Sequence, residues 1–152
     1  MDAGLPSLEE VILSNREIAA IVRDQNPLIL SPEASVREAC RCMRDRRVGA
    51  VLVTKPDRQL VGIFTGRDAV TRVLAEGRDS ATTRLSEVMT PTPDTMPPDK
   101  HAIDALRLMQ DGGFRHLPIV EGRMVVGILS RGDFRGLEQA RLDEETGLWE
   151  RI

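Results

Sequence analysis

The chain has 152 residues, of which 41% are hydrophobic and 30% charged, as expected for a globular protein of one domain or two half-size units. The formal net charge of −3 argues against a general nucleic-acid-binding protein, which would carry a basic excess. No apolar run approaches the roughly 18 residues that cross a bilayer, and residues 1–6 lack the positive-then-apolar order of a signal peptide. We therefore expect a cytoplasmic protein with no membrane partner and no nucleic-acid partner.

The first half of the chain predicts an extra N-terminal helical segment at residues 1–24 and then a β-α-β-β-α unit at residues 25–78. The first helix of the unit, at about 35–46, is indicated by apolar residues at i, i+3, i+4 and i+7, namely Val36, Ala39, Cys40 and Met43. The other expected elements are strands at 29–30, 49–53 and 60–64 and a helix that begins near residue 68. The middle strand is an unbroken apolar run, which is typical of a strand buried on both faces.

The second half of the chain repeats this unit. The helical spacing that begins at Val36 recurs at Ala102, Ala105, Leu106 and Met109. We expect a linker and second repeat at 79–136 and a charged tail at 137–152. The elements expected in the second repeat are a helical turn at 85–89, strands at 95–96, 117–120 and 124–129, and helices at 101–112 and from about 133. One such unit buries little apolar surface alone, so the fold class is α/β (α+β) with two pseudo-symmetric repeats packed into one module.

Each repeat ends in the same strand-to-helix signature, GIFTGRD at residues 62–68 and GILSRGD at residues 127–133. The free N–H groups at the start of a helix attract phosphate. The signature adds a hydroxyl at that point and, three residues on, a carboxylate that can accept hydrogen bonds from a ribose diol: Thr65 with Asp68, and Ser130 with Asp133. Arg67 and Arg131 lie between them and can neutralise phosphate charge.

The same spacing has a purely structural interpretation. A Thr or Ser followed by an acidic residue three positions later is the pattern of an ordinary helix N-cap, and each signature taken singly favours capping. The recurrence of a glycine three residues before the hydroxyl, at Gly62 and Gly127, favours ligand binding instead. A glycine at that place lets another group approach the strand backbone closely.

The two signatures, with LSEVMTPTPDTMPPD at 85–99 and FRHLPIV at 114–120, resemble tandem CBS domains, the pair often called a Bateman module. The resemblance covers about residues 20–136. It implies two clefts between CBS repeats that bind an adenosyl nucleotide as a regulatory ligand: AMP, ADP, ATP, NAD or S-adenosylmethionine. It also implies a homodimer that signals to an unknown effector protein. In the family the motif Asp holds the ribose and the Thr or Ser contacts phosphate, and the RH at Arg115 and His116 matches a further phosphate-contacting position.

The repeats differ in the strand that follows their first helix. The second repeat has RHLP at 115–118, whereas the first has GAVL at 49–52. Arg46 and Arg47 lie three positions earlier and are not expected to reach the same place. We therefore expect one cleft with a fuller polar set and one plainer cleft. The fuller cleft is built around Ser130, Asp133, Arg115 and His116, and the plainer one around Thr65 and Asp68.

Other functions compete with this interpretation. An enzyme is disfavoured because the sequence has no dinucleotide-binding glycine motif, no P-loop and no metal-ligand cluster, so we assign no catalytic and no metal-binding residue. A redox role for Cys40 and Cys42 is disfavoured because Cys40 falls on the apolar helix face and Cys42 points elsewhere. The main rival is a ligand-free dimerisation or interaction scaffold.

Overall fold

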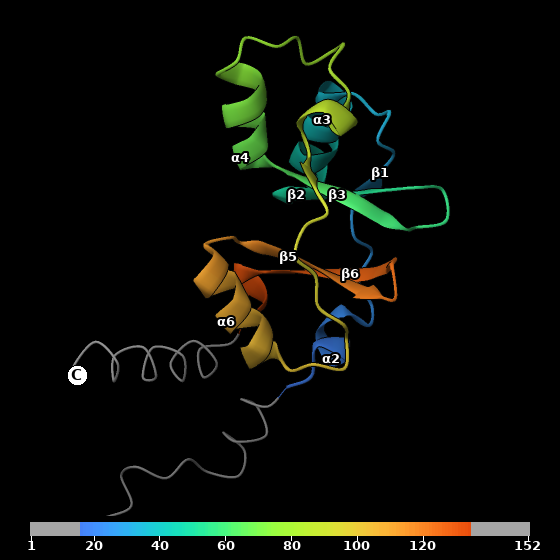
Figure 1. Cartoon of the computed structure of the whole chain (residues 1–152), viewed down its shortest axis with the longest axis vertical. Helices are drawn as coiled ribbons and strands as arrows, with labels where there is room; N and C mark the ends of the chain where they lie inside the picture. Colours follow the sequence, from blue (N-terminus) through green and yellow to red (C-terminus); the bar gives the residue numbers. More distant parts are fainter. Residues whose placement is uncertain (1–15, 135–152) are drawn as a thin grey trace, which may run out of the picture.

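The structure, a computed structural model, describes residues 16–134, and the first repeat is the upper half of Figure 1. Its elements are β1 (Ile29–Leu30), α3 (Val36–Arg46), β2 (Ala50–Thr54), β3 (Leu60–Thr65), α4 (Gly66–Asp68), the π-helix η1 (Ala69–Leu74), α5 (Leu85–Val88) and β4 (Thr90–Pro91). The sheet order is β1-β2-β3-β4, with β1 parallel to β2 and the other pairs antiparallel. The predicted strands and helices of this repeat are confirmed to within about two residues at their ends.

The second repeat consists of α6 (Ala102–Gly112), the antiparallel pair β5 (His116–Glu121) and β6 (Met124–Ser130), and the 3-10 turn η2 (Arg131–Asp133). The strand predicted at 95–96 is wrong. Met96 alone makes a parallel bridge to Ile119, in which Met96 N–H donates to Pro118 O and Val120 N–H donates to Met96 O. The ladder would continue through the N–H of residue 98 or of residue 118, and both residues are prolines, which have no N–H. Residues 1–15 and the tail predicted at 137–152 lie outside the described residues.

Each of the two short helices that precede a repeat packs on the other repeat. The helix α2 (Ile18–Val22) lies beside the second repeat in Figure 1, and its Ile18 and Val22 join the core of that repeat with Met109. Helix α5, which precedes the second repeat in sequence, buries Leu85 and Val88 in the core of the first repeat. Neither repeat therefore completes its core from its own stretch of sequence. No helix in the described part of the chain is long and apolar enough to cross a membrane.

The glycine of each signature is explained by this exchange. A Cβ built at Gly62 would lie 2.4 Å from Met89 Sδ, and one built at Gly127 would lie 2.5 Å from Val22 Cβ. The group that approaches the strand is thus the segment at the end of α5 or α2. These glycines do not make room for a ligand, contrary to the expectation from sequence, because protein side chains already fill that space.

Strand β2 joins the two repeats. All five of its residues are buried, as the unbroken apolar run predicts. Val51 and Val53 face the first-repeat core, while Ala50 and Leu52 pack in a separate cluster with Val125 of the second repeat. The hairpins of the two repeats also exchange backbone hydrogen bonds, from Leu60 N–H to Arg123 O at 3.0 Å and from Val125 N–H to Arg58 O at 3.1 Å. The two repeats therefore share a core along β2.

Candidate functional site

The larger cleft between the repeats, which we call cleft 1, has a volume of about 680 Å³. The first repeat contributes residues 65–68 of its signature. The segment at and after the end of α5, residues 88–94, which we call the connector, contributes Thr90, Pro93 and Asp94. The second repeat contributes residues 113–116, the loop between α6 and β5 and the first residue of β5. Cleft 1 therefore has polar groups from both repeats and the connector.

A smaller cleft, cleft 2, has a volume of about 330 Å³ and is related to cleft 1 by the internal repeat. It is lined by Ser130 and Asp133 of the second signature, by residues 25–28 after α2, and by residues 46–50 at the end of α3 and the start of β2. His116 lines this cleft as well as cleft 1. The two clefts thus have the same plan and share one side chain.

The clefts combine residues across the repeats, which corrects the grouping expected from sequence. Arg115 faces the first signature in cleft 1 and is not among the residues that line cleft 2 with Ser130 and Asp133. Arg46 and Arg47, which we did not expect to reach such a position, line cleft 2. The physical reason is that the repeats pack face to face, so the signature of one repeat lies opposite the helix-to-strand loop of the other. Cleft 2 is lined by as many polar or charged residues as cleft 1, so the expected contrast between a fuller and a plainer cleft is wrong.

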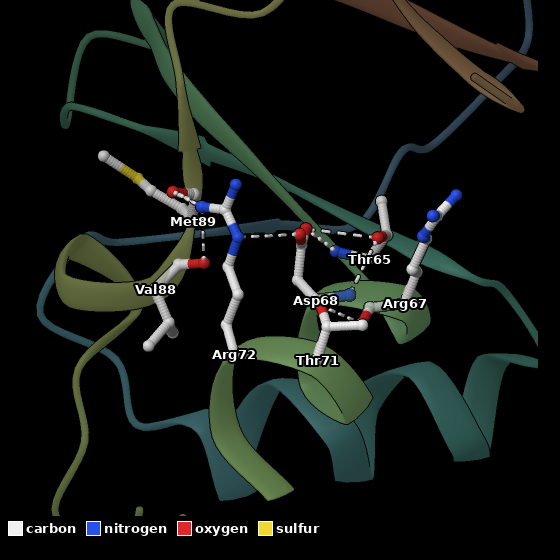
Figure 2. A network of polar contacts seen from close by, with 7 residues as sticks. All are labelled: Thr65, Arg67, Asp68, Thr71, Arg72, Val88 and Met89. Atoms are coloured by element: carbon white, nitrogen blue, oxygen red, sulfur yellow. Dashed lines mark hydrogen bonds and ion pairs between the residues drawn. The ribbon is translucent and has the colours of Figure 1, made fainter. Parts of the chain in front are cut away.

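The first signature forms a capping box at the start of α4 (Figure 2). The backbone N–H and the Oγ1 hydroxyl of Thr65 donate to Asp68 Oδ2 at 2.9 and 3.1 Å, and the Asp68 N–H donates to Thr65 Oγ1 at 3.3 Å. Asp68 is only 8% exposed, so these bonds replace the water that its carboxylate would otherwise bind. The predicted capping role is confirmed, and Asp68 also lines cleft 1.

Asp68 has a further partner in Arg72 of η1. Figure 2 shows the guanidinium between the Asp68 carboxylate and the connector. Arg72 Nε lies 3.5 Å from Asp68 Oδ1, and Nη1 donates to the backbone oxygens of Met89 at 3.0 Å and Val88 at 3.4 Å. Sequence reasoning missed this residue, although its position four residues after an aspartate on a helix indicates an ion pair.

The second signature has the same box with a different support. Ser130 donates to Asp133 Oδ2 from its backbone N–H at 2.7 Å and from its hydroxyl at 3.1 Å. Arg16, just before α2, donates from Nη2 to the backbone oxygen of Asp133 at 2.8 Å. Asp133 is half-buried and lines cleft 2. Arg131 is exposed and is not among the residues that line either cleft, whereas Arg67 is exposed and lines cleft 1.

His116 lines both clefts. It is half-buried, and a Cβ built at Gly49 would lie 3.3 Å from its Nε2, so a side chain at position 49 would require a small shift of the imidazole. Burial lowers the pKa of His116, the positive charge of Arg115 lowers it further, and Asp133 opposes the shift. The imidazole is therefore biased toward its neutral form, and an anion in either cleft would favour the charged one.

The register of the internal repeat could have identified other lining residues that sequence reasoning missed. It aligns Pro27 in cleft 2 with Pro93 in cleft 1, and Arg47 in cleft 2 with Gly113 in cleft 1. Two positions that line one cleft thus predict two that line the other.

The described residues offer little for metal or thiol chemistry. Among residues 16–134 no group of three or more His, Cys, Asp or Glu side chains is placed to hold a metal ion. Cys40 and Cys42 both pack against the first-repeat core. Burial raises the pKa of the Cys40 thiol, which disfavours the reactive thiolate.

Two α/β repeats that enclose a related pair of clefts define a tandem-repeat module, and comparisons with known proteins agree. The fold is similar to that of CBS domain protein PAE2072 from Pyrobaculum aerophilum complexed with AMP, with a TM-score of 0.74, 22% identity, and coverage of 84% of this chain and 98% of that one. The CBS domain model matches the chain twice, at residues 17–75 and 85–138. The chain belongs to the CBS-domain family.

Two relatives illustrate the size range of the similar proteins. The chain is 44% identical over 108 residues to CBS domain-containing protein CBSCBSPB2 of Arabidopsis thaliana, covering 71% of this chain and 20% of that protein. It is 38% identical over 104 residues to CBS domain-containing protein YhcV of Bacillus subtilis, covering 68% of this chain and 73% of that protein. The chain thus spans about a fifth of the length of the Arabidopsis relative and most of the bacterial one.

Proposed function

We propose that the chain is a cytoplasmic regulatory module, not an enzyme, that binds an adenosyl nucleotide in cleft 1 and signals to an effector protein. The observation that carries the proposal is the convergence in cleft 1 of Thr65 and Asp68 with Arg115 and His116 of the other repeat. Such a set offers a guanidinium, a hydroxyl and an imidazole for phosphate, and a carboxylate for a ribose diol. The name of PAE2072, which describes a complex with AMP, supports the same ligand class.

The chemistry of cleft 1 suits a nucleotide in size and in charge. Its volume of about 680 Å³ lies within the usual range for small-ligand sites. Arg67 and Arg115 are exposed at its rim, where they can pair with phosphate without first being desolvated. Asp68 is already fixed by its capping bonds, so its orientation is set before the ligand arrives. AMP, ADP, ATP, NAD and S-adenosylmethionine are all candidates.

Cleft 2 is the weaker candidate. Ser130 and Asp133 would contact the ribose and phosphate there, and Arg46 and Arg47 would supply positive charge, while Arg131 could contribute only from outside the lining described. The volume of about 330 Å³ is half that of cleft 1. We therefore propose that cleft 1 fills first.

The experiment is a thermal-shift panel of AMP, ADP, ATP, NAD, NADH and S-adenosylmethionine at millimolar concentration. Ligand at about 100 times its Kd should stabilise the protein by about 2.7 kcal/mol. A Tm that does not move with any of the six contradicts the proposal and favours the ligand-free scaffold.

Two double variants assign the cleft. Arg67→Gln with Arg115→Gln removes two cations from cleft 1, and Arg46→Gln with Arg47→Gln removes two from cleft 2. All four arginines are exposed, so neither variant should disturb the core. Loss of the nucleotide shift in the first variant alone supports cleft 1, whereas loss in the second alone assigns the ligand to cleft 2.

We also propose that the module works as a homodimer. Val70 and Leu74 lie four residues apart on η1 and are 57% and 72% exposed, an unusual exposure for two large apolar side chains on one helix side. Packing against a second copy would bury them. Light scattering after size exclusion should show a dimer for the natural chain and a monomer for Leu74→Glu; a natural monomer at all concentrations contradicts this proposal.

A further inference from the structure

Arg72 touches both the wall of cleft 1 and the segment that connects the two repeats. Its Nε faces Asp68 Oδ1 at 3.5 Å, and its Nη1 donates to the carbonyl oxygen of Met89 at 3.0 Å (Figure 2). The side chain is 46% exposed, so its conformation depends on these partners rather than on burial. A planar guanidinium with several N–H donors can reach two partners at once, which a lysine cannot do with the same geometry.

The connector held by Arg72 is itself a wall of cleft 1. Met89 packs over Gly62, and the next residues form β4, which pairs with β3 in the register Ile63 to Thr90 and Gly62 to Pro91. Thr90 lines cleft 1, as do Pro93 and Asp94 a few residues on. The same guanidinium therefore contacts the Asp68 carboxylate and the start of this wall.

We propose that Arg72 is a positioning residue that couples occupancy of cleft 1 to the connector at residues 88–94, so that ligand and connector order each other. The inference rests on the proposed nucleotide site and adds how the presence of a ligand in cleft 1 is transmitted to the connector. A nucleotide bound beside Asp68 would shield the partly exposed Asp68–Arg72 pair from water and so strengthen it, and Arg72 in turn holds the Val88 and Met89 carbonyls. Because coupling between two sites is reciprocal, a connector held by Arg72 also tightens the ligand.

The device is specific to cleft 1. The register that aligns Asp68 with Asp133 aligns Arg72 with Leu137, a residue type with no charge and no side-chain donor. The described support of Asp133 comes instead from Arg16, through the backbone oxygen. Signals from a nucleotide in cleft 1 would therefore reach the connector by an arginine that has no counterpart at the equivalent position of the second repeat.

Arg72→Met is the decisive variant, because methionine keeps an apolar stem of similar length and removes every donor. The matched control is Arg78→Gln: Arg78 Nη1 lies 3.7 Å from Glu87 Oε1, so it also contacts α5, but through a different acid. Each protein is titrated with AMP by calorimetry, and hydrogen exchange of residues 88–94 is measured with and without AMP.

In the natural chain AMP should bind and slow exchange across residues 88–94. Arg72→Met should raise the Kd for AMP by about fivefold, the low end of usual couplings between sites, and abolish the slowing of exchange. Arg78→Gln should leave the Kd within about twofold and keep the AMP-dependent protection, because exposed single ion pairs contribute little. Arg72→Lys should keep part of the affinity but not the protection, because one ammonium cannot span both partners.

The inference is overturned if the natural chain binds AMP and Arg72→Met keeps both the Kd and the protection. It is also overturned if Arg78→Gln reproduces the loss, which would mean general loosening of α5, or if Arg72→Lys restores full protection. A natural chain that binds no AMP and none of the other five nucleotides overturns the proposed function, and this inference with it; the titration of the natural chain separates that outcome from the others.

Discussion

The two signatures share one capping geometry, yet the clefts beside them differ in size, charge and support. In cleft 1 the carboxylate of Asp68 is paired with Arg72 and lies in a cleft that Arg115 of the other repeat also lines. In cleft 2 Asp133 shares the lining with Arg46 and Arg47, and its described arginine contact is through the backbone. A duplicated motif therefore fixes the local turn, while the character of each site comes from the opposite repeat and from the connector. The following experiments test that difference.

The largest difference is expected at the two signature glycines. Gly127→Ala should destabilise the protein by about 3 kcal/mol, because its Cβ would meet Val22 Cβ at 2.5 Å and this β-branched side chain cannot rotate away. Gly62→Ala should cost about 1–2 kcal/mol, because its main obstacle is the flexible end of Met89. Urea unfolding measures both.

Gly66→Ala is the control for this pair. A Cβ at Gly66 meets nothing within 4 Å, so the free energy of unfolding should change by no more than about 0.5 kcal/mol. Equal losses of stability at Gly62 and Gly127 would mean that Met89 is as rigid as Val22, and that the ends of α5 and α2 pack on their strands in equivalent ways.

The aspartates should differ by less. Asp68→Asn keeps an acceptor for the Thr65 N–H but loses the charge paired with Arg72, in a side chain that is nearly buried; we expect a loss of about 1–2 kcal/mol. Asp133→Asn keeps the Ser130 N–H bond at a half-buried site and should cost under about 1 kcal/mol. Unfolding in urea without ligand gives both values.

Nucleotide titrations of the same variants separate binding from capping. Each variant should weaken binding in its own cleft, because the amide is a poorer acceptor for a ribose diol. A variant that lowers stability and leaves every nucleotide affinity unchanged would show that its carboxylate is only a cap.

A smaller effect is expected where α3 and α6 end. Both C-caps are left-handed, with φ of 56° at Arg47 and 71° at Gly113. Glycine adopts this conformation without strain, so Arg47→Gly should stabilise the chain by about 0.5–1 kcal/mol while removing a cation from cleft 2. Gly113→Ala is the reciprocal variant and should destabilise. A destabilised Arg47→Gly would mean that the arginine makes a contact that outweighs its backbone strain.

The smallest effect concerns pH and the shared histidine. The pKa of His116 is lowered by burial and by Arg115, so the unfolded chain binds a proton more readily than the folded one. The contribution of His116 is therefore fully present above its unfolded pKa of about 6.5 and is lost as the pH falls below it. Tm measured from pH 7.5 to 5.5 should fall more steeply for the natural chain than for His116→Gln. Parallel slopes would contradict a neutral His116.

Much of the fold follows from local sequence pattern, and much of the site does not. Local sequence pattern predicts the helix that begins at Val36 and the doubly buried strand β2. Comparison of the two halves of the sequence predicts the register of the internal repeat. The strand expected at 95–96 is absent because Pro98 and Pro118 lack the N–H groups that a second bridge on either side of Met96 would need. Capping is predictable because it depends on a hydroxyl and a carboxylate three positions apart.

The pairing of residues across the clefts could not be obtained in that way. Placing Arg115 opposite Thr65, or Arg46 in cleft 2, needs the relative orientation of the repeats, which no periodicity encodes. The duplication did contain part of the answer. A pseudo-twofold relation between repeats that face each other brings unlike segments of the two copies together, so each signature lies opposite the helix-to-strand loop of the other repeat.

The exchange of α2 and α5 between the repeats makes the sequence repeat different from the folding unit. A cut at residues 77–83, between η1 and α5, would leave α2 on one fragment and the core that buries it, around Met109, on the other. Helix α5 would likewise be separated from the core that buries Leu85 and Val88. Each fragment would expose an unfilled groove and carry the helix that fills its neighbour's groove, so the halves can become folded only as a complementary pair. Each half of the chain therefore supplies the helix that completes the core of the other half.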